Sequence, residues 1–170
     1  TGNDEVLAGI ESAAGGGTYR VFADFTPAAT GRGLYASEDL IVSGPRLSAP
    51  EAGQAVEKDG HRFNLAVSPR PARAGQPLDL EFTVTRGDGG AVALDRVMDA
   101  FAHLVAFDAG RTGFAHLHPV DAPAGVPMDP ARVTLRFKLT IPRGGIYTVW
   151  AQLILSGREE FVPFRLEVAD

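Results

Sequence analysis

The sequence predicts an all-β protein built around an immunoglobulin-like antiparallel β-sandwich of about seven strands. Short apolar runs alternate with polar residues along most of the chain, which is the period of a pleated strand. Twelve prolines and twenty glycines interrupt these runs. Over residues 60–170 the runs recur roughly every 8–12 residues, the spacing typical of such sandwiches. Apolar residues make up 45 % of the chain, which is enough for a packed core.

The composition divides the chain into three parts. Residues 1–44 contain a predicted hairpin, preceded by an apolar spacing in residues 1–14 that favours a single helical turn. Residues 45–59 are rich in Pro, Ala, Ser, Gly and Glu and are predicted to be a linker. Residues 60–170 are predicted to form the sandwich.

The predicted strands of the sandwich follow one another with turn residues between them. Pro163 lies inside the last strand and indicates a sheet edge or a bulge, because proline cannot donate to a ladder. Trp150 and Tyr147 are predicted to fill the core. The strands are expected at residues 61–68, 78–86, 91–94, 101–107, 114–118, 133–141, 146–155 and 160–168, with a Pro-rich loop at 120–131.

A partial internal repeat relates the two ends of the chain. Residues 16–25, GGTYRVFADF, match residues 144–153, GGIYTVWAQL, and an apolar strand follows each. Residues 1–44 are therefore predicted to be the C-terminal hairpin of a truncated first sandwich repeat. Because a lone hairpin is marginal in water, residues 18–43 are expected to pack on the main domain or to dimerise with a second copy.

Three of the four histidines lie in residues 96–119, RVMDAFAHLVAFDAGRTGFAHLHP. This stretch is predicted to form two strands joined by a turn at residues 108–113, which supply the Asp and Gly that chain reversals favour. If Phe107 lies opposite Phe114, then His103 lies opposite His118, and the third histidine joins them on one face. A slip of one residue sends His103 to the other face. The predicted register therefore gathers His103, His116 and His118.

Three imidazoles on one face predict a metal site, with copper or zinc as the ion. Asp99 and Asp121 are candidates for a fourth ligand or a hydrogen-bond partner, and Met98 and Met128 are candidate thioether ligands, although loop acids and core methionines are commoner. The alternative is structural. In that case each imidazole bonds a carbonyl or carboxylate, and the domain is a non-catalytic structural or interaction module.

Several function classes are disfavoured by what the sequence lacks. Without cysteine there is no thiol catalysis, disulfide or Cys-ligated zinc. The net charge of −5 comes with no basic stripe, so a nucleic-acid partner is not expected. No apolar run approaches the roughly 20 residues of a membrane span. Neither a nucleophile elbow nor a phosphate loop occurs, so no enzyme is predicted, and a metal-dependent hydrolase is the weakest alternative. His61 is expected at the surface.

The sequences HLVAF, FAHLHP and GGIYTVWAQL together resemble a bacterial family of tandem immunoglobulin-like proteins, similar to the YtkA-like and FixH-like modules associated with copper or heavy-metal handling. The resemblance covers roughly residues 95–168 and 16–43. It implies an extracytoplasmic β-sandwich, periplasmic or secreted, with a protein partner in the cell envelope. It also implies that His103, His116 and His118 are the repeated histidines of the family. The start at Thr1 rather than Met is compatible with loss of a preceding signal or anchor.

Overall fold

The computed structural model describes residues 15–46, 52–120 and 129–170 of the chain. The chain divides into two compact units, Thr1–Ala49 and Pro50–Asp170, and each is described by itself. The helical turn predicted in residues 1–14 lies outside the described residues, as does most of the predicted Pro-rich loop. Over the part of the chain that is described, no helix has the length and apolarity needed to cross a membrane.

The first unit contains a two-stranded antiparallel hairpin. Strand β1 (Gly17–Phe25) pairs with strand β2 (Leu34–Val42) along its whole length, in agreement with the predicted hairpin. Arg20 and Asp39 lie opposite each other, and the guanidinium Nε donates to the Asp39 carboxylate at 2.7 Å. The pairing thus brings an opposite-charge pair together across the strands, which stabilises a hairpin modestly.

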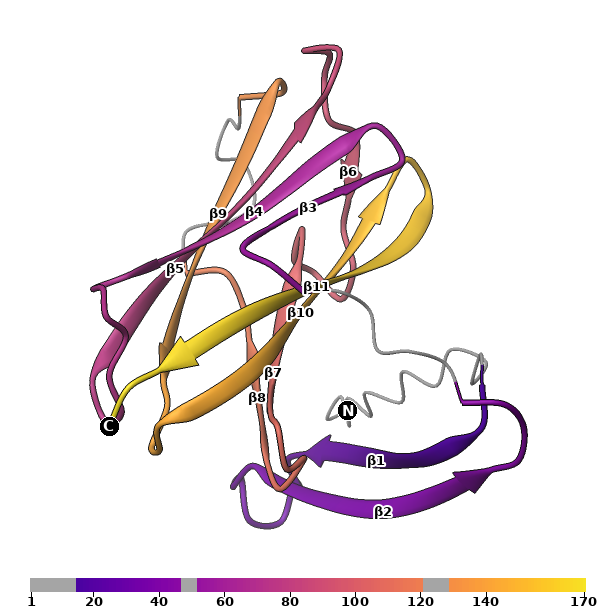
Figure 1. Cartoon of the computed structure of the whole chain (residues 1–170), viewed down its shortest axis with the longest axis vertical. Helices are drawn as coiled ribbons and strands as arrows, with labels where there is room; N and C mark the ends of the chain where they lie inside the picture. The colour runs from indigo at the N-terminus through magenta and orange to yellow at the C-terminus, as the bar shows by residue number, and fades with distance from the viewer. Residues whose placement is uncertain (1–14, 47–51, 121–128) are drawn as a thin grey trace. The chain divides into compact units, whose positions relative to one another are not determined.

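The second unit is a β-sandwich of two antiparallel sheets (Figure 1). One sheet has the strand order β3-β4-β5-β9, and the other has the order β11-β10-β7-β8, with the short strand β6 also pairing with β10. The predicted sandwich is therefore confirmed. The strands are β3 (Ala55–Lys58), β4 (His61–Ser68), β5 (Pro77–Arg86), β6 (Leu94–Asp95), β7 (His103–Asp108), β8 (Phe114–Leu117), β9 (Arg132–Thr140), β10 (Gly145–Leu155) and β11 (Arg158–Val168).

The core lies between the two sheets. The inward positions of β5 and β9 alternate with outward polar residues, as the sequence pattern predicts. Phe82 is fully buried between Phe63, whose ring stacks at 6.4 Å, and Phe164, whose ring meets it edge-on at 5.9 Å. Leu104 and Ala106 on β7 are also buried in this core, so the side of β7 that carries small and aliphatic residues faces inward.

Residues 55–58 differ from the predicted linker, because they form β3 and pair with β4. The Pro- and Ala-rich composition suggested a linker, but the turn chemistry of Asp59-Gly60 outweighs it. Asp59 and Gly60 have φ angles of 49° and 74°, the left-handed conformation that a two-residue hairpin turn requires at both positions. The sandwich thus begins before residue 60 and contains more strands than the predicted seven or so.

The two matching segments of the internal repeat share a local geometry. The Tyr19 hydroxyl donates to the carbonyl of Gly15 at 2.7 Å, and the Tyr147 hydroxyl donates to the carbonyl of Arg143 at 2.9 Å. Each tyrosine lies opposite a leucine of the following strand, Leu40 for Tyr19 and Leu166 for Tyr147. The repeat therefore extends from sequence to hairpin register. Its origin in a truncated first sandwich stays a prediction.

Of the two aromatic residues predicted to fill the core, Tyr147 packs against it as predicted. The prediction for Trp150 is wrong. Val149 and Ala151 are the buried neighbours of Trp150, so Trp150 points to the outer face of the sheet, where it is half-buried. Both faces of β10 carry large apolar residues, so the alternation does not reveal which face turns inward. Pro163 lies opposite Trp150 on β11, which is a sheet-edge strand as predicted.

Candidate metal centre

The β7–β8 hairpin has the register that the sequence predicts. Phe107 lies opposite Phe114, and Val105 lies opposite His116. The two phenyl rings are 6.1 Å apart, so the aromatic pair sits beside the turn. With this register His103 at the start of β7 and His118 just past the end of β8 come to the same end and the same face of the hairpin.

Asp108 organises the turn that sets this register. Its carboxylate accepts hydrogen bonds from the Thr112 amide at 2.7 Å, the Thr112 hydroxyl at 2.6 Å and the Gly113 amide at 3.3 Å. Burial raises the pKa of Asp108, but the hydrogen bonds from Thr112 and Gly113 outweigh it and hold the pKa below its usual range. The side chain of Asp108 therefore adds to the backbone hydrogen bond that the Arg111 amide donates to the Asp108 carbonyl at 2.9 Å.

The histidines lie on the outer face of their sheet, away from the core. Leu104 and Ala106 are buried between the sheets, so His103 and Val105, which alternate with them, point outward. Val105 lies opposite Trp150 on the neighbouring strand β10, which places the tryptophan on the histidine face. The site is thus built on the outer, partly apolar face of this sheet.

The three imidazole rings converge. The ring centroids of His103 and His118 are 4.6 Å apart, those of His116 and His118 are 4.7 Å apart, and those of His103 and His116 are 5.2 Å apart. One nitrogen from each ring can be chosen so that all three lie within 4.8 Å of one another. His103 is buried, His116 is half-buried and His118 is exposed, so the cluster opens to solvent on the His118 side.

His103 is the unusual member of the cluster. Its side chain is fully buried, and neither ring nitrogen has a hydrogen-bond partner among the described residues. A buried polar group without a partner is costly, about 1–3 kcal/mol, and so calls for an explanation. Burial, followed by the nearby rings of His118 and His116, lowers the pKa of His103 from its usual 6.5 to about 4. At pH 7 the ring is neutral, which is the form that binds metal ions.

The spacing of the rings fits a metal ion after a small contraction. Nitrogens bound at about 2.0–2.1 Å to one tetrahedral ion lie on the order of 3.3 Å apart. The separations of up to 4.8 Å are wider than this. His116 is half-buried and His118 is exposed, so binding an ion requires these rings to move closer to His103. The donor set of three neutral imidazoles suits zinc, copper and nickel.

The candidate ligand Asp99 does not join the cluster. Within the described residues the group contains imidazoles and no carboxylate. Asp99 is exposed and, with Met98, forms a tight turn in which both φ angles are positive, 45° for Met98 and 63° for Asp99. Asp121 and Met128 lie outside the described residues. His61 is half-buried at the start of β4, where its Nδ1 lies 3.0 Å from the carbonyl oxygen of Asp59, and it takes no part in the cluster.

Two residues beside the cluster were not predicted from the sequence. Gln152 on β10 lies directly opposite His103, is buried, and donates from Nε2 to the carboxylate of Glu159 at 2.6 Å. Glu159 is exposed on β11. The only local signal is a glutamine in an otherwise apolar strand. Its position opposite His103 follows only from the pairing of β10 with β7.

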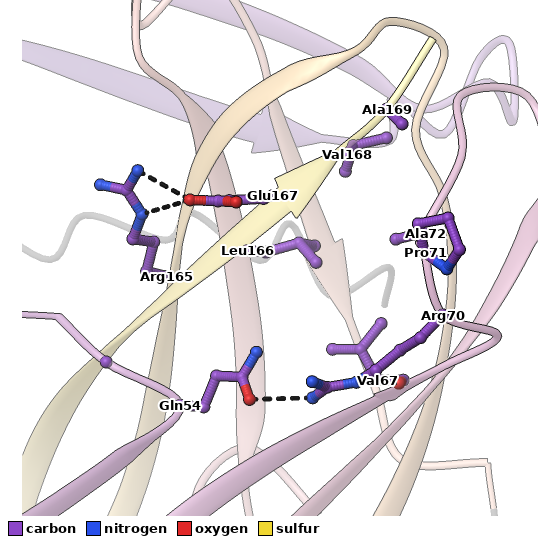
Figure 2. A pocket seen from close by; sticks show the side chains of 11 residues that line it. Gln54, Val67, Arg70, Pro71, Ala72, Arg165, Leu166, Glu167, Val168 and Ala169 are labelled. Carbon is purple, nitrogen blue, oxygen red and sulfur yellow. Dashed lines mark hydrogen bonds and ion pairs between the residues drawn. The ribbon is translucent and has the colours of Figure 1, made fainter.

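A groove on another part of the sandwich contains no histidine. It lies between Gln54, residues 67–72 and the end of β11 (Figure 2). Its two guanidinium groups already have partners, since Arg70 donates to the Gln54 side chain at 2.9 Å and Arg165 donates to Glu167 at 2.8 Å. The groove therefore presents paired charges rather than free cations, and the histidine cluster remains the stronger candidate site.

The fold and the cluster define a β-sandwich domain with three imidazoles gathered on one outer sheet face. Residues 54–170 match a family described as a domain of unknown function (DUF8832), and the chain belongs to this family. Among curated proteins none matches the chain.

Proposed function

We propose that the domain binds a transition-metal ion through His103, His116 and His118, and that copper or zinc is the ion it holds. The convergence of three imidazoles, one of them buried and without a hydrogen-bond partner, carries the proposal. A histidine kept for structural reasons is expected to bond a carbonyl or a carboxylate. His103 does neither among the described residues, which favours a ligand role over a purely structural one.

The proposal includes a non-catalytic role in an extracytoplasmic protein. The resemblance to YtkA-like and FixH-like modules supports this location, and it favours copper over zinc. The open side at His118 gives a bound ion an exchangeable position, which suits uptake and release. Within the described residues the ligand group consists of imidazoles alone, and the proposed role is to bind the ion.

Calorimetric titration of the metal-free protein with Cu(II) and with Zn(II) tests the proposal. The matched variants are His116→Ala/His118→Ala, which removes two ligands, and His61→Ala, which removes the histidine outside the cluster. We expect one ion per chain for the wild type and for His61→Ala. The double variant is expected to bind at least about 100-fold more weakly, because even the loss of an outer hydrogen-bond partner costs 10–100-fold.

Thermal melts complete the test. An ion that binds only the folded state stabilises it by about 2.7 kcal/mol at a free concentration 100 times the dissociation constant. The wild type is expected to melt at a higher temperature with the ion than with a chelator, and the double variant is expected to show no difference. Equal heats from the wild type and the double variant would remove the three-histidine site.

A further inference from the structure

We propose that Gln152, held in place by Glu159, accepts a hydrogen bond from His103 and orients that ring when a metal ion is bound. This inference rests on the proposed function, because it concerns how the same site is completed. It adds two positioning residues, from β10 and β11, to a ligand set that comes entirely from the β7–β8 hairpin.

Gln152 lies on the strand next to His103. Gln152 and His103 are directly opposed in the β10–β7 pairing, so both side chains leave the same face with Cβ atoms about 4.5–5.5 Å apart. Both side chains are buried, at 9 % and 0 % exposure. A buried amide and a buried imidazole therefore lie on adjacent strands and on the same face of the sheet.

The second observation fixes the orientation of the amide. The Nε2 of Gln152 lies 2.6 Å from Oε1 of Glu159. A carboxylate only accepts hydrogen bonds, so the amide nitrogen and not the amide oxygen must face Glu159. The oxygen of Gln152 then remains as the acceptor. Glu159 thus determines which end of the amide is available to other groups.

The third observation is the state of His103 itself. Neither of its ring nitrogens has a hydrogen-bond partner within the described residues. When one nitrogen of a histidine binds a metal ion, the other nitrogen carries a proton and nearly always donates it to a nearby oxygen. Loading the site therefore creates a buried N–H next to Gln152, whose free oxygen can accept it after a small rotation of the ring.

The pair also places a negative charge near a site that has none of its own. Three neutral imidazoles leave the charge of a divalent ion uncompensated, and Glu159 is linked to the site through Gln152. The carboxylate is exposed, so its direct attraction for the ion is screened. Its main effect is to align the glutamine.

Zinc affinity, measured by competition with a chelating dye, tests the inference on the full chain. The variant Gln152→Leu keeps the size of the side chain and removes the acceptor, and it is expected to bind Zn(II) about tenfold more weakly. Glu159→Gln is expected to weaken binding in the same direction, because a second amide no longer fixes the orientation of the first. The control is Glu167→Gln, which makes the same charge change on the same strand, at a residue paired with Arg165.

A rescue variant separates positioning from general damage. In Gln152→Glu/Glu159→Gln the donor and acceptor of the pair are exchanged, and an oxygen still faces His103. Its zinc affinity is expected to return to within about threefold of the wild type, a small part of the cost of losing an outer hydrogen-bond partner. Nitrogen-detected NMR of the zinc-loaded protein adds a direct readout. His103 should show one metal-bound nitrogen and one protonated nitrogen, and the proton should exchange faster in Gln152→Leu.

The outcomes distinguish the two proposals. If the wild type does not bind Zn(II) or Cu(II), the metal site and this inference both fail. If the wild type binds while Gln152→Leu and Glu159→Gln bind as well as Glu167→Gln does, the site stands and the positioning role is wrong. If Gln152→Leu weakens zinc binding and Glu159→Gln does not, Glu159 has no part in positioning Gln152.

Discussion

The rings of His103 and His118 meet edge to face with centroids 4.6 Å apart, although His103 begins β7 and His118 follows the end of β8. This contact depends on the turn between the strands, because a slip of one residue would send one ring to the core side. The Asp108 carboxylate helps to hold this turn, together with the backbone hydrogen bond from the Arg111 amide to the Asp108 carbonyl. The geometry of the candidate site therefore rests on a residue that lies outside the cluster.

Replacing Asp108 with alanine is expected to weaken metal binding as well as folding. The change removes hydrogen bonds to Thr112 and Gly113, at a cost of about 1–2 kcal/mol in the free energy of unfolding. Zinc affinity should fall with it, because the register of the hairpin is less firmly set. Urea melts of the metal-free protein and zinc titrations measure the two effects.

Asp88 provides the control for this experiment. Its carboxylate also holds a turn, accepting from the Gly90 amide at 2.9 Å and from Arg86 at 2.6 Å, but this turn lies outside the histidine hairpin. Asp88→Ala should lower stability without changing zinc affinity measured well below the melting temperature. Equal losses of affinity in the two variants would mean that the Asp108 turn has no special role.

The metal-free protein is expected to lose stability in acid through His103. Its pKa in the folded state is lowered to about 4 from a usual value of 6.5, first by burial and then by the rings of His118 and His116. The unfolded chain therefore binds the proton more readily. The stability that depends on a neutral His103 is fully present above pH 6.5 and is lost as the pH falls toward 4.

The expected loss between pH 7 and pH 4.5 is about 2–3 kcal/mol as an upper limit. Urea melts at both pH values measure it, and His103→Leu is the matched variant, because leucine fills the buried position without titrating. The pH dependence of this variant should be flatter over the same window. A parallel dependence in the two proteins would assign the acid sensitivity to other groups.

Sequence patterns predicted the histidine cluster because its determinants are local. The Asp and Gly residues of the 108–113 turn and the facing pair of Phe107 and Phe114 fix the hairpin within one short stretch. The pairing of β10 with β7 is long-range, and no local pattern specifies it. The local sequence therefore does not predict Gln152 as part of the site, although this residue lies directly opposite His103.

The errors in the fold have equally specific causes. Trp150 was expected in the core because immunoglobulin-like sandwiches bury such a tryptophan. Both faces of β10 carry large apolar residues, and Trp150 lies on the outer one. Residues 55–58 were expected in a linker because of the composition around them, whereas the Asp59-Gly60 turn joins them to β4. In both cases the strand pairing, which is not visible in the local sequence, decided the outcome.

Breaking the ion pair between Lys58 and Glu160 is expected to destabilise the sandwich. The Glu160 carboxylate is buried, at 8 % exposure. It accepts a hydrogen bond from Lys58 at 2.5 Å and forms a longer ion pair with Arg158 at 3.4 Å. Lys58→Met leaves this carboxylate with only the longer contact, which should cost about 1–3 kcal/mol. The substitution also removes an ion pair that links β3 to β11.

Lys138→Met is the matched control. Lys138 and Asp79 also form a short pair, at 2.7 Å, but both side chains are about two-thirds exposed. Surface pairs of this kind contribute little, about 0–1 kcal/mol. Urea melts of the two variants at pH 7 should therefore separate clearly, with Lys58→Met the less stable. Equal midpoints would show that Arg158 alone is enough to hold Glu160.

Trp150 is expected to report on copper binding. It is the single tryptophan of the chain and lies opposite Val105, which in turn lies opposite His116. Adjacent strands are about 4.8 Å apart, so the backbones of Trp150 and His116 are separated by roughly 10 Å on one face. At this range a redox-active, paramagnetic Cu(II) ion quenches indole emission, whereas Zn(II), with a filled d shell, leaves it nearly unchanged.

Titration of the wild type with Cu(II) should lower the tryptophan emission, and the decrease should level off at one ion per chain. His61→Ala should behave in the same way, and His116→Ala/His118→Ala should show no saturable quenching. Saturable quenching of equal size in the double variant would place the copper elsewhere on the protein and would exclude the three-histidine cluster as its site.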